Sequence, residues 1–398
     1  MTSIIYSLPY IALFLFLCGF AIPVTTGKNR LMNTYWQRYA FFACLIAFVG
    51  LRGFIFTDWK NYYSFYEAAP TLFDGTEAIV TFLSKSRYAV FEKGFSLFSI
   101  LIKTISDNYF FYQFVSFSID VVILYAFFKM YVPNAVLLAF VFFYVFNGVI
   151  GQGIQINFLR NAKAMMLFLI SLPYLQKRKY AVYVLLNIIG AFFHISSILY
   201  IPLCFILRKR FSRLFYIAIF IMGNAIYLLQ IRYISVLLKS ASVIAGGQIA
   251  YIINRYIDNS KWNTSYGISI GYFERVFTYI LVLCFSKRLY KKDCNIVFIN
   301  CLFLYVLLYL YFSEMKILTD RLPLLFAFSY WVIYPQIYSF LSKNNKLLFW
   351  GIFILYATLK IANGHRSILN LYDNALFLNY SFQERLSNLN KYMRSLPK

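Results

Sequence analysis

The chain contains a series of apolar runs, each about as long as a helix that crosses a lipid bilayer. The hydrocarbon core of a bilayer is about 30 Å thick and an α-helix rises about 1.5 Å per residue, so a crossing helix needs about 20 apolar residues. The runs occupy 4–24, 35–56, 109–130, 133–150, 157–175, 211–231, 268–286, 294–313, 319–341 and 346–363. This series predicts an all-α, polytopic integral membrane protein.

Two further stretches fit the length of a crossing helix badly. Residues 93–106 are short, and residues 180–207 are long and interrupted by the sequence FHISS. Broken backbone at membrane depth is tolerated only where protein or a watery cavity surrounds it. We therefore expect re-entrant or broken segments at 93–106 and 180–207. With these, the chain would form one transmembrane domain over 1–398 that contains about 10–12 transmembrane helices.

The composition excludes a soluble fold. Hydrophobic residues make up 61% of the 398 residues and charged residues 13%, which is about half the charged share of a soluble domain. Lysine and arginine number 38 against 14 aspartate and glutamate, giving a formal net charge of +24. Such an excess can accompany nucleic-acid binding, but the apolar majority leaves too little polar surface for a soluble nucleic-acid-binding protein. We expect no nucleic-acid partner.

The positions of the basic residues predict the orientation of the chain, because lysine and arginine are enriched in cytoplasmic loops. Short basic connections include 28–30, 177–179, 208–213, 287–292 and 343–346. If they are cytoplasmic, both termini lie outside, as do the longer segments 57–92, 232–267 and 364–398. This arrangement requires that 93–106 does not cross and that 180–207 is a hairpin. The alternative makes both stretches full spans and leaves 177–179 outside.

The C-terminal tail, 364–398, carries an amphipathic pattern. Its apolar residues recur at helical spacing, at Phe382, Leu386, Leu389, Met393 and Leu396. A helix with one apolar face commonly lies in the plane of the membrane surface. We therefore predict that the tail is interfacial.

Ionisable side chains within or beside apolar runs are costly, so each is a candidate for function. They are Arg52, Asp58, Glu92, Asp120, Arg160, His194, Arg232, Glu274, Arg275, Glu314, Asp320 and Arg321. Most of them lie at the predicted outer ends of the spans. Guanidinium groups form forked hydrogen bonds with phosphate oxygens and stay charged when partly dehydrated. The set fits an anionic ligand that is embedded in the membrane.

Several motifs of nucleotide and metal chemistry are absent from the sequence. The chain has no GxxxxGK[ST], GxGxxG, HExxH or DxD pattern, and its only histidines are His194 and His365. The cysteines lie in or beside apolar runs without a CxxC pair. We expect no metal site, no disulfide framework and no cofactor.

Five segments carry short polar motifs in a fixed order. They are GLRGFIFTDWKNYYSFY (50–66), VFEKGFSLFSILI (90–102), INFLRNAKAMMLFLIS (156–171), KRKYAVYVLLNIIGAFFHISSILYIPL (177–203) and ILTDRLPLLFAF (317–328). Together they resemble the EpsG/Wzy-type family of bacterial polysaccharide polymerases over most of the chain. Two positions depart from the family pattern: Thr57 stands where glycine usually precedes the aspartate, and Asn161 where glutamine is commoner.

The resemblance implies a glycosyltransferase of the bacterial inner membrane. It would join undecaprenyl-pyrophosphate-linked oligosaccharide repeat units at the outer, periplasmic face to make O-antigen, capsule or exopolysaccharide. Its implied partners are those lipid-linked oligosaccharides, membrane lipids and a chain-length regulator. The pyrophosphate is already a good leaving group, so this chemistry needs cations to bind developing charge and a base for the acceptor hydroxyl.

The residue types in these segments suggest a site. The candidate catalytic groups are His194, Asp58 and Glu92, and the candidate groups for binding pyrophosphate are Arg52, Arg160, Asn161, Ser197, Arg255, Asp320 and Arg321. Tyr62, Tyr63 and Tyr66 are candidate platforms for sugar stacking.

Each charged candidate also has a structural interpretation. His194 is a candidate core histidine, and Arg160 a candidate anchor at the membrane surface. Glu92 is placed to cap the helix predicted over 93–106. Arg52 with Asp58, and Asp320 with Arg321, are candidate structural ion pairs.

Three other functions would also fit some of these sequence features. An O-antigen ligase would look similar but usually carries a longer single outer loop. A lipid-linked oligosaccharide flippase or other transporter would show symmetric halves and charged residues deep in central helices. A membrane O-acyltransferase also uses an intramembrane histidine, the part that His194 would take.

Overall fold

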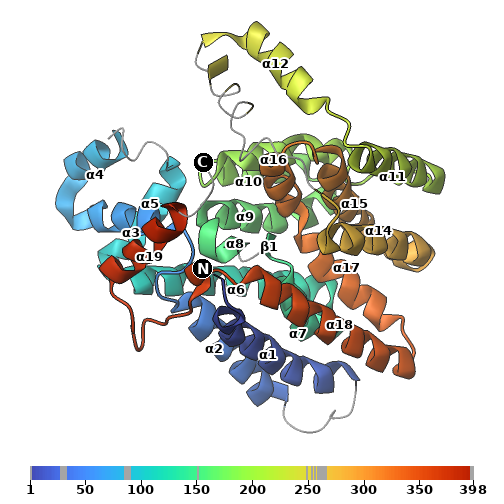
Figure 1. Cartoon of the computed structure of the whole chain (residues 1–398), viewed down its shortest axis with the longest axis horizontal. Coiled ribbons are helices and arrows are strands. Elements are labelled where there is room, and N and C mark those ends of the chain that lie inside the picture. The colour runs from blue at the N-terminus through green and yellow to red at the C-terminus, as the bar shows by residue number, and fades with distance from the viewer. Residues whose placement is uncertain are drawn as a thin grey trace. The chain divides into compact units, whose positions relative to one another are not determined.

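The computed structural model describes residues 2–26, 34–84, 91–149, 152–247, 250–251, 254, 257 and 267–394. Over these residues the chain is almost wholly helical, as Figure 1 shows. Its only strands there are β1 (Gly148–Val149) and β2 (Gln152–Gly153), which pair antiparallel. The prediction of an all-α fold is confirmed. The chain divides into two compact units, Met1–Cys204 with Tyr334–Lys398, and Phe205–Ile333.

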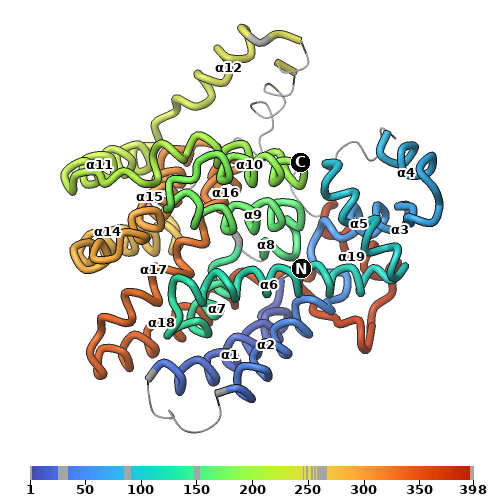
Figure 2. The backbone as a smooth tube through the Cα atoms, turned by 180° about the vertical axis from the view of Figure 1, so that it is seen from behind, coloured from blue at the N-terminus to red at the C-terminus, as the bar shows by residue number. Residues whose placement is uncertain are grey.

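The larger unit is built on long apolar helices that pack side by side. They are α1 (Leu8–Thr26), α2 (Thr34–Gly50), α6 (Tyr109–Tyr131), α7 (Val136–Val145), α9 (Leu159–Gln176), α10 (Tyr180–Ala191) and α18 (Lys343–Gly364). Helix α1 packs against α2, α7 and α18, while α2 packs against α6, α6 against α9 and α9 against α10 (Figure 2). Asn108 begins α6 by accepting hydrogen bonds from two backbone N–H groups of its first turn.

A second layer of shorter helices covers one end of this unit. It consists of α3 (Trp59–Ala68), the 3₁₀ turn η2 (Leu72–Asp74), α4 (Gly75–Ser84), α5 (Lys93–Ile105) and α19 (Phe382–Arg394). We call α3, α4, α5 and α19 the loop cluster. These helices share a core that is largely aromatic, with Phe54, Trp59, Tyr62, Phe65, Tyr66, Phe95, Tyr109, Tyr112 and Leu389 buried in it. Large aromatic side chains dominate the burial energy of such cores.

The predicted break in 180–207 is present. Helix α10 ends at Ala191, and the 3₁₀ helix η5 (Ile195–Phe205) begins after the interruption at Phe192, Phe193 and His194. The two arms run back along each other, because the Tyr183 hydroxyl donates to the Tyr200 carbonyl at 2.6 Å. Helix α5, over the short stretch 93–106, has 13 residues and is therefore only about 20 Å long.

The smaller unit consists of α11 (Arg213–Leu228), α12 (Ile234–Ala245), α14 (Ile270–Leu289), α15 (Asn295–Tyr311), α16 (Lys316–Arg321) and the 3₁₀ turn η6 (Pro323–Phe326). Helix α15 packs against α11, α14 and α16. The carboxylate of Glu314 accepts hydrogen bonds from the backbone nitrogens of Tyr233, Ile234 and Ser235, so it caps the start of α12. In the chain, α17 (Phe328–Ser339) links this unit to the last part of the larger one.

The larger unit also contains four short elements, which are the turns η1 (Ile4–Ser7), η4 (Pro133–Ala135) and η7 (Ile368–Asn370) and helix α8 (Ile154–Asn157).

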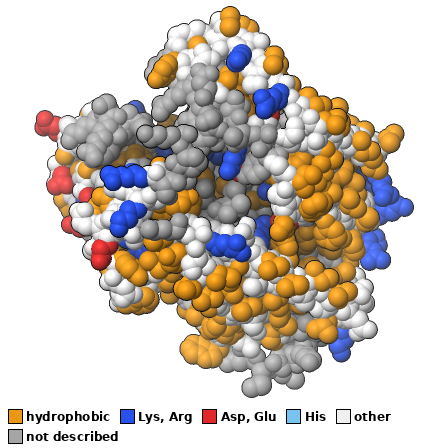
Figure 3. Space-filling view, in the orientation of Figure 1, with side chains coloured by type: hydrophobic (Ala, Val, Ile, Leu, Met, Phe, Trp, Pro, Cys, Tyr) orange, Lys and Arg blue, Asp and Glu red, His pale blue; other side chains and the backbone are white. Residues whose placement is uncertain are grey.

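Three of the described helices are long and apolar enough to cross a membrane: Ile4–Thr25, Tyr109–Tyr131 and Lys343–Gly364. Several shorter apolar helices accompany them, among them Asn295–Tyr311 and Arg213–Leu228. Large apolar side chains are exposed on many of these helices, for example Val122, Ile221 and Leu355, whereas a soluble surface rarely presents broad apolar patches. Figure 3 shows apolar side chains spread over the visible face, with acidic ones gathered over the loop cluster.

The described part of the C-terminal tail packs against the loop cluster. Leu389 is 2% exposed and belongs to the core of the loop cluster. The Phe382 ring lies 5.2 Å from the Trp59 ring, and Leu386 packs against the same core. Met393 is exposed, and Leu396 lies outside the described residues. The apolar face that the sequence assigned to the membrane surface is thus largely covered by protein, because the aromatic side chains of α3 offer it an apolar partner.

Candidate functional site

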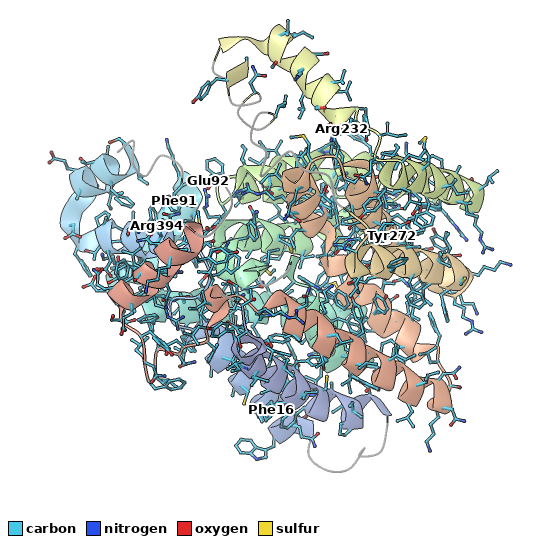
Figure 4. The ribbon with its side chains drawn as sticks, in the orientation of Figure 1. Phe16, Phe91, Glu92, Arg232, Tyr272 and Arg394 are labelled. Atoms are coloured by element: carbon cyan, nitrogen blue, oxygen red, sulfur yellow. The ribbon has the colours of Figure 1, made fainter. Side chains whose placement is uncertain are left out.

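The ion pair between Glu92 and Arg160 lies where the loop cluster meets the long helices. Arg160 Nη1 lies 2.7 Å from Glu92 Oε2, and each side chain is 20% exposed. The guanidinium carbon of Arg160 also lies 5.0 Å from the centre of the Phe91 ring. Figure 4 shows Phe91 and Glu92 at the side of the loop cluster next to α10. Glu92 is the N-cap residue of α5 but makes no side-chain capping hydrogen bond, so its carboxylate serves the ion pair.

The break between α10 and η5 docks on the start of α5. The second carboxylate oxygen of Glu92 accepts a hydrogen bond from the Ile195 backbone nitrogen at 3.3 Å. The backbone nitrogen of Gly94 donates to the carbonyl of Phe192 at 2.8 Å. His194 Nδ1 lies 2.8 Å from the Ser196 hydroxyl. These contacts bring the FHISS segment beside Glu92, although the two are far apart in the sequence.

Asp58 and Tyr62 approach the same pair from α3. The Asp58 backbone nitrogen donates to Asn157 Oδ1 at 3.0 Å, and the Thr57 hydroxyl donates to Asp58 Oδ1 at 3.1 Å. The Tyr62 hydroxyl and the Arg160 side chain are hydrogen-bonded. Burial raises the pKa of Tyr62 to about 12, with Arg160 opposing and Asp58 reinforcing the rise. Tyr62 is therefore a neutral phenol near neutral pH.

We call Asp58, Tyr62, Glu92, Arg160 and His194 the junction site. It places two carboxylates, an imidazole, a phenol and a guanidinium at one end of the larger unit. A carboxylate or imidazole there could accept a proton from a hydroxyl group, and the guanidinium could bind an anion through forked hydrogen bonds.

Two predicted polar residues flank the junction site. Asn161 follows Arg160 on α9, and its Oδ1 is buried without a hydrogen-bond partner among the described residues. Ser197 is fully buried, and its hydroxyl is packed tightly against Gly190 of α10. Ser197 thus lies at the contact between the two arms of the broken segment.

Arg52 is held by the end of α2 and by the C-terminal tail. It is 4% exposed, its Nη1 donates to the carbonyl of Val49 at 2.7 Å, and its backbone pairs with Asn374 of the tail. Asp320 and Arg321 end α16 in the smaller unit. Arg255 lies outside the described residues.

The predicted tyrosine platforms face protein. Tyr66 is fully buried, and its hydroxyl donates to the carbonyl of Ser106 at 2.7 Å. Tyr62 is also buried, and the ring of Tyr63 lies 5.2 Å from Phe54 and 5.3 Å from Tyr109. The rings of these tyrosines pack within the loop cluster, and their role in sugar stacking stays a prediction.

Sequence reasoning missed Lys163 and Asn157. Lys163 forms an ion pair with Asp120, at 2.7 Å, between α9 and α6. Its position could have marked it as a candidate, because it is a lysine inside the apolar run 157–175 and follows Arg160 by three residues. Asn157 ends α8 and holds the Thr57–Asp58 turn. Among the described residues, no three His, Cys, Asp or Glu side chains are grouped so as to hold a metal ion.

Comparison with known proteins identifies the family. No curated protein and no solved structure matches the chain significantly. The model of the EpsG family matches residues 35–382, a range that includes the whole junction site. The chain therefore belongs to the EpsG family.

Proposed function

We propose that this protein is a polysaccharide polymerase that acts on lipid-linked glycans. It would transfer a growing glycan from undecaprenyl pyrophosphate to a hydroxyl of the next lipid-linked repeat unit, at the outer face of the bacterial inner membrane. Membership of the EpsG family suggests polymerase activity. The observation that carries the specific reaction is the Glu92–Arg160 pair, which lies beside Asp58 and His194.

The proposed reaction exchanges one glycosidic bond for another. The acceptor oxygen bonds to the anomeric carbon of the donor, the bond from that carbon to pyrophosphate breaks, and undecaprenyl pyrophosphate leaves. The hydroxyl proton passes to Glu92, Asp58 or His194, the groups able to accept it. Arg160 would bind the negative charge that develops on the pyrophosphate. Arg52, Arg255 and Arg321 stay predicted contributors to binding.

Backbone pairing supports the orientation proposed for the larger unit. Thr2 pairs with Ser367, which lies three residues after the end of α18. Arg52, which lies two residues after the end of α2, pairs with Asn374. The start of α1, the end of α2 and the end of α18 therefore lie on one side of the unit. The basic segment 28–30 follows the end of α1 in the chain, and the basic residues of 343–346 lie in the first turn of α18. Both segments adjoin the opposite ends of these helices, which fits a cytoplasmic location for them.

The hairpin formed by α10 and η5 supports the first of the two topologies considered for 180–207. The Tyr183–Tyr200 hydrogen bond holds the second arm beside the first, which fits a hairpin that returns to the side from which it came. Under this arrangement, 177–179 and 208–213 both lie in the cytoplasm and the FHISS break reaches the junction site from the cytoplasmic side. Helix α5 stays within the loop cluster, and the chain crosses the membrane about ten times.

Complementation of a strain that lacks the gene tests the proposal. Glu92→Gln, Arg160→Ala and His194→Ala proteins would each be expressed, and the polysaccharide would be resolved by gel electrophoresis. We expect Arg160→Ala to reduce polymerisation by at least about 100-fold, the usual effect of removing a group that stabilises developing charge, leaving single-repeat products. Asp107→Asn is the matched control, because Asp107 is 84% exposed and pairs only loosely with Lys103.

Other gel patterns separate the remaining functions. Long chains that are not attached to lipid A-core in the deletion strain would indicate a ligase, and chains of normal length that lack acetyl groups would indicate an O-acyltransferase. If all three variants gave the wild-type distribution of chain lengths, the junction site would not be the active site.

A further inference from the structure

A buried ion pair lies next to the junction site. Lys163 Nζ lies 2.7 Å from Asp120 Oδ1 and donates to the carbonyl of Ser116 at 2.6 Å. The two side chains are 6% and 2% exposed. Asp120 lies at the middle of α6, one of the helices long enough to cross a membrane. Charges at such depth are costly even when paired, so they commonly mark a functional requirement.

The pair is connected to Arg160 through α9. Residues three apart on a helix point to the same side, so Lys163 lies one turn beyond Arg160 on the same face. Lys163 Nζ also lies 5.4 Å from the centre of the Phe98 ring, on α5. Arg160 contacts the start of that same helix through Glu92. The first turns of α9 are therefore held to α5 by Arg160 and to α6 by Lys163.

We infer that Asp120 and Lys163 are positioning residues for Arg160. The Lys163 ammonium group makes two short hydrogen bonds to α6, and these hold α9 in one orientation relative to α6. Apolar packing alone would let one helix rotate or slide against the other. By fixing the rotation and height of α9 against α6, the pair sets where the Arg160 guanidinium meets Glu92 and the donor pyrophosphate. The inference rests on the proposed function, in which Arg160 binds that pyrophosphate.

A double-mutant cycle tests this role. The purified protein in lipid nanodiscs would be supplied with an undecaprenyl-pyrophosphate-linked repeat unit, and initial polymerisation rates would be measured for Asp120→Asn, Arg160→Lys and the double variant. A displacement of about 1 Å at a reacting group can lower the rate about 100-fold, so we expect Asp120→Asn to lose between about 10-fold and 100-fold. Because both changes act through one guanidinium, the double variant should lose no more than about 3-fold beyond Arg160→Lys.

A second variant covers the case in which Asp120→Asn does not fold. Replacing a buried ion pair by apolar side chains of similar size is often tolerated by the fold. The Asp120→Leu/Lys163→Met protein should therefore reach the membrane in normal amounts, yet polymerise as poorly as Asp120→Asn. Asp107→Asn, in the exposed connection between α5 and α6, is the control for loss of a carboxylate.

The outcomes separate this inference from the proposed function. The positioning role alone would be overturned if the rate losses of Asp120→Asn and Arg160→Lys multiplied when the two changes were combined. Full activity of the Asp120→Leu/Lys163→Met protein would overturn it too. Wild-type rates for both Arg160→Lys and Arg160→Ala would contradict the proposed function itself.

Discussion

Gly94 illustrates how the junction site depends on contacts between backbones. Its nitrogen donates to the carbonyl of Phe192 at 2.8 Å, which ties the first turn of α5 to the break after α10. A Cβ atom at this position would lie 2.7 Å from that same carbonyl oxygen. Relief would require one of the two backbones to move, and either movement would shift Glu92 or His194. Glycine is therefore required here by close approach.

We predict that Gly94→Ala impairs polymerisation. Overpacking at a tight contact usually costs about 1–3 kcal/mol, so the melting temperature should fall along with the rate. Gly351→Ala is the control, because Gly351 lies in α18 and a methyl group added there would meet no atom within 4 Å apart from those of its chain neighbours and its own helix backbone. Alanine there should stabilise the helix by about 0.5–1 kcal/mol. Wild-type chain lengths and melting temperature in Gly94→Ala would show that the contact is dispensable.

At the scale of elements, α19 closes the loop cluster rather than extending away from it. Arg385, which is 4% exposed, donates from Nη1 to the carbonyl of Leu371 at 2.7 Å, and its Nη2 lies 3.7 Å from Asp373 Oδ2. The same Asp373 packs against Gly53, whose nitrogen donates to the Asp373 carbonyl at 2.9 Å. The tail is thus fastened to the chain directly before α3, the helix that carries Tyr62.

We predict that Leu389→Ala releases the tail. Removing a fully buried leucine side chain costs about 2–5 kcal/mol, and Leu389 is 2% exposed in the core of the loop cluster. Thermal unfolding should begin at a lower temperature, and limited proteolysis should cut within 371–381. Met393→Ala is the matched control on the same helix, because Met393 is half exposed. Equal effects of the two changes would argue against packing of α19 on the cluster.

At the scale of the whole molecule, pairing between the N-terminal residues and the tail links the two ends of the larger unit. The Ser3 nitrogen donates to the carbonyl of Arg366 at 2.8 Å, beside the bridge between Thr2 and Ser367. The tail then pairs with Arg52 and Gly53. Three helix ends are thereby held on the side of the unit that carries the loop cluster, and this side faces outward in the proposed topology.

Cysteine labelling tests that topology. The native cysteines would first be replaced. We then expect Gln383→Cys on α19 to react with a membrane-impermeant maleimide added to cells in which the outer membrane has been opened and the inner membrane is intact. Lys177→Cys, in the basic connection between α9 and α10, should react only after the inner membrane is permeabilised. Both residues are exposed, so accessibility on each side decides the result. Labelling of Lys177→Cys in intact cells would favour the alternative with 180–207 as a full span.

The sequence by itself determined those features that depend on residues close together in the chain. Apolar runs of helical length predict the all-α fold, and the FHISS interruption predicts the break in 180–207, because both depend on residues that are neighbours in the chain. The polar motifs likewise singled out Glu92, Arg160, His194 and Asp58 as candidates. Each of these predictions needs only the periodicity and chemistry of a short segment.

Only the tertiary structure decided which of these groups meet. Arg160 pairs with Glu92 across 68 positions of sequence, and Lys163 with Asp120 across 43. No periodicity encodes such distances, which result from how α5, α6 and α9 pack. The same packing covers Tyr66 and turns the apolar face of α19 onto the loop cluster. A pattern identifies an apolar or charged side chain, but burial against a particular neighbour is a property of the folded chain.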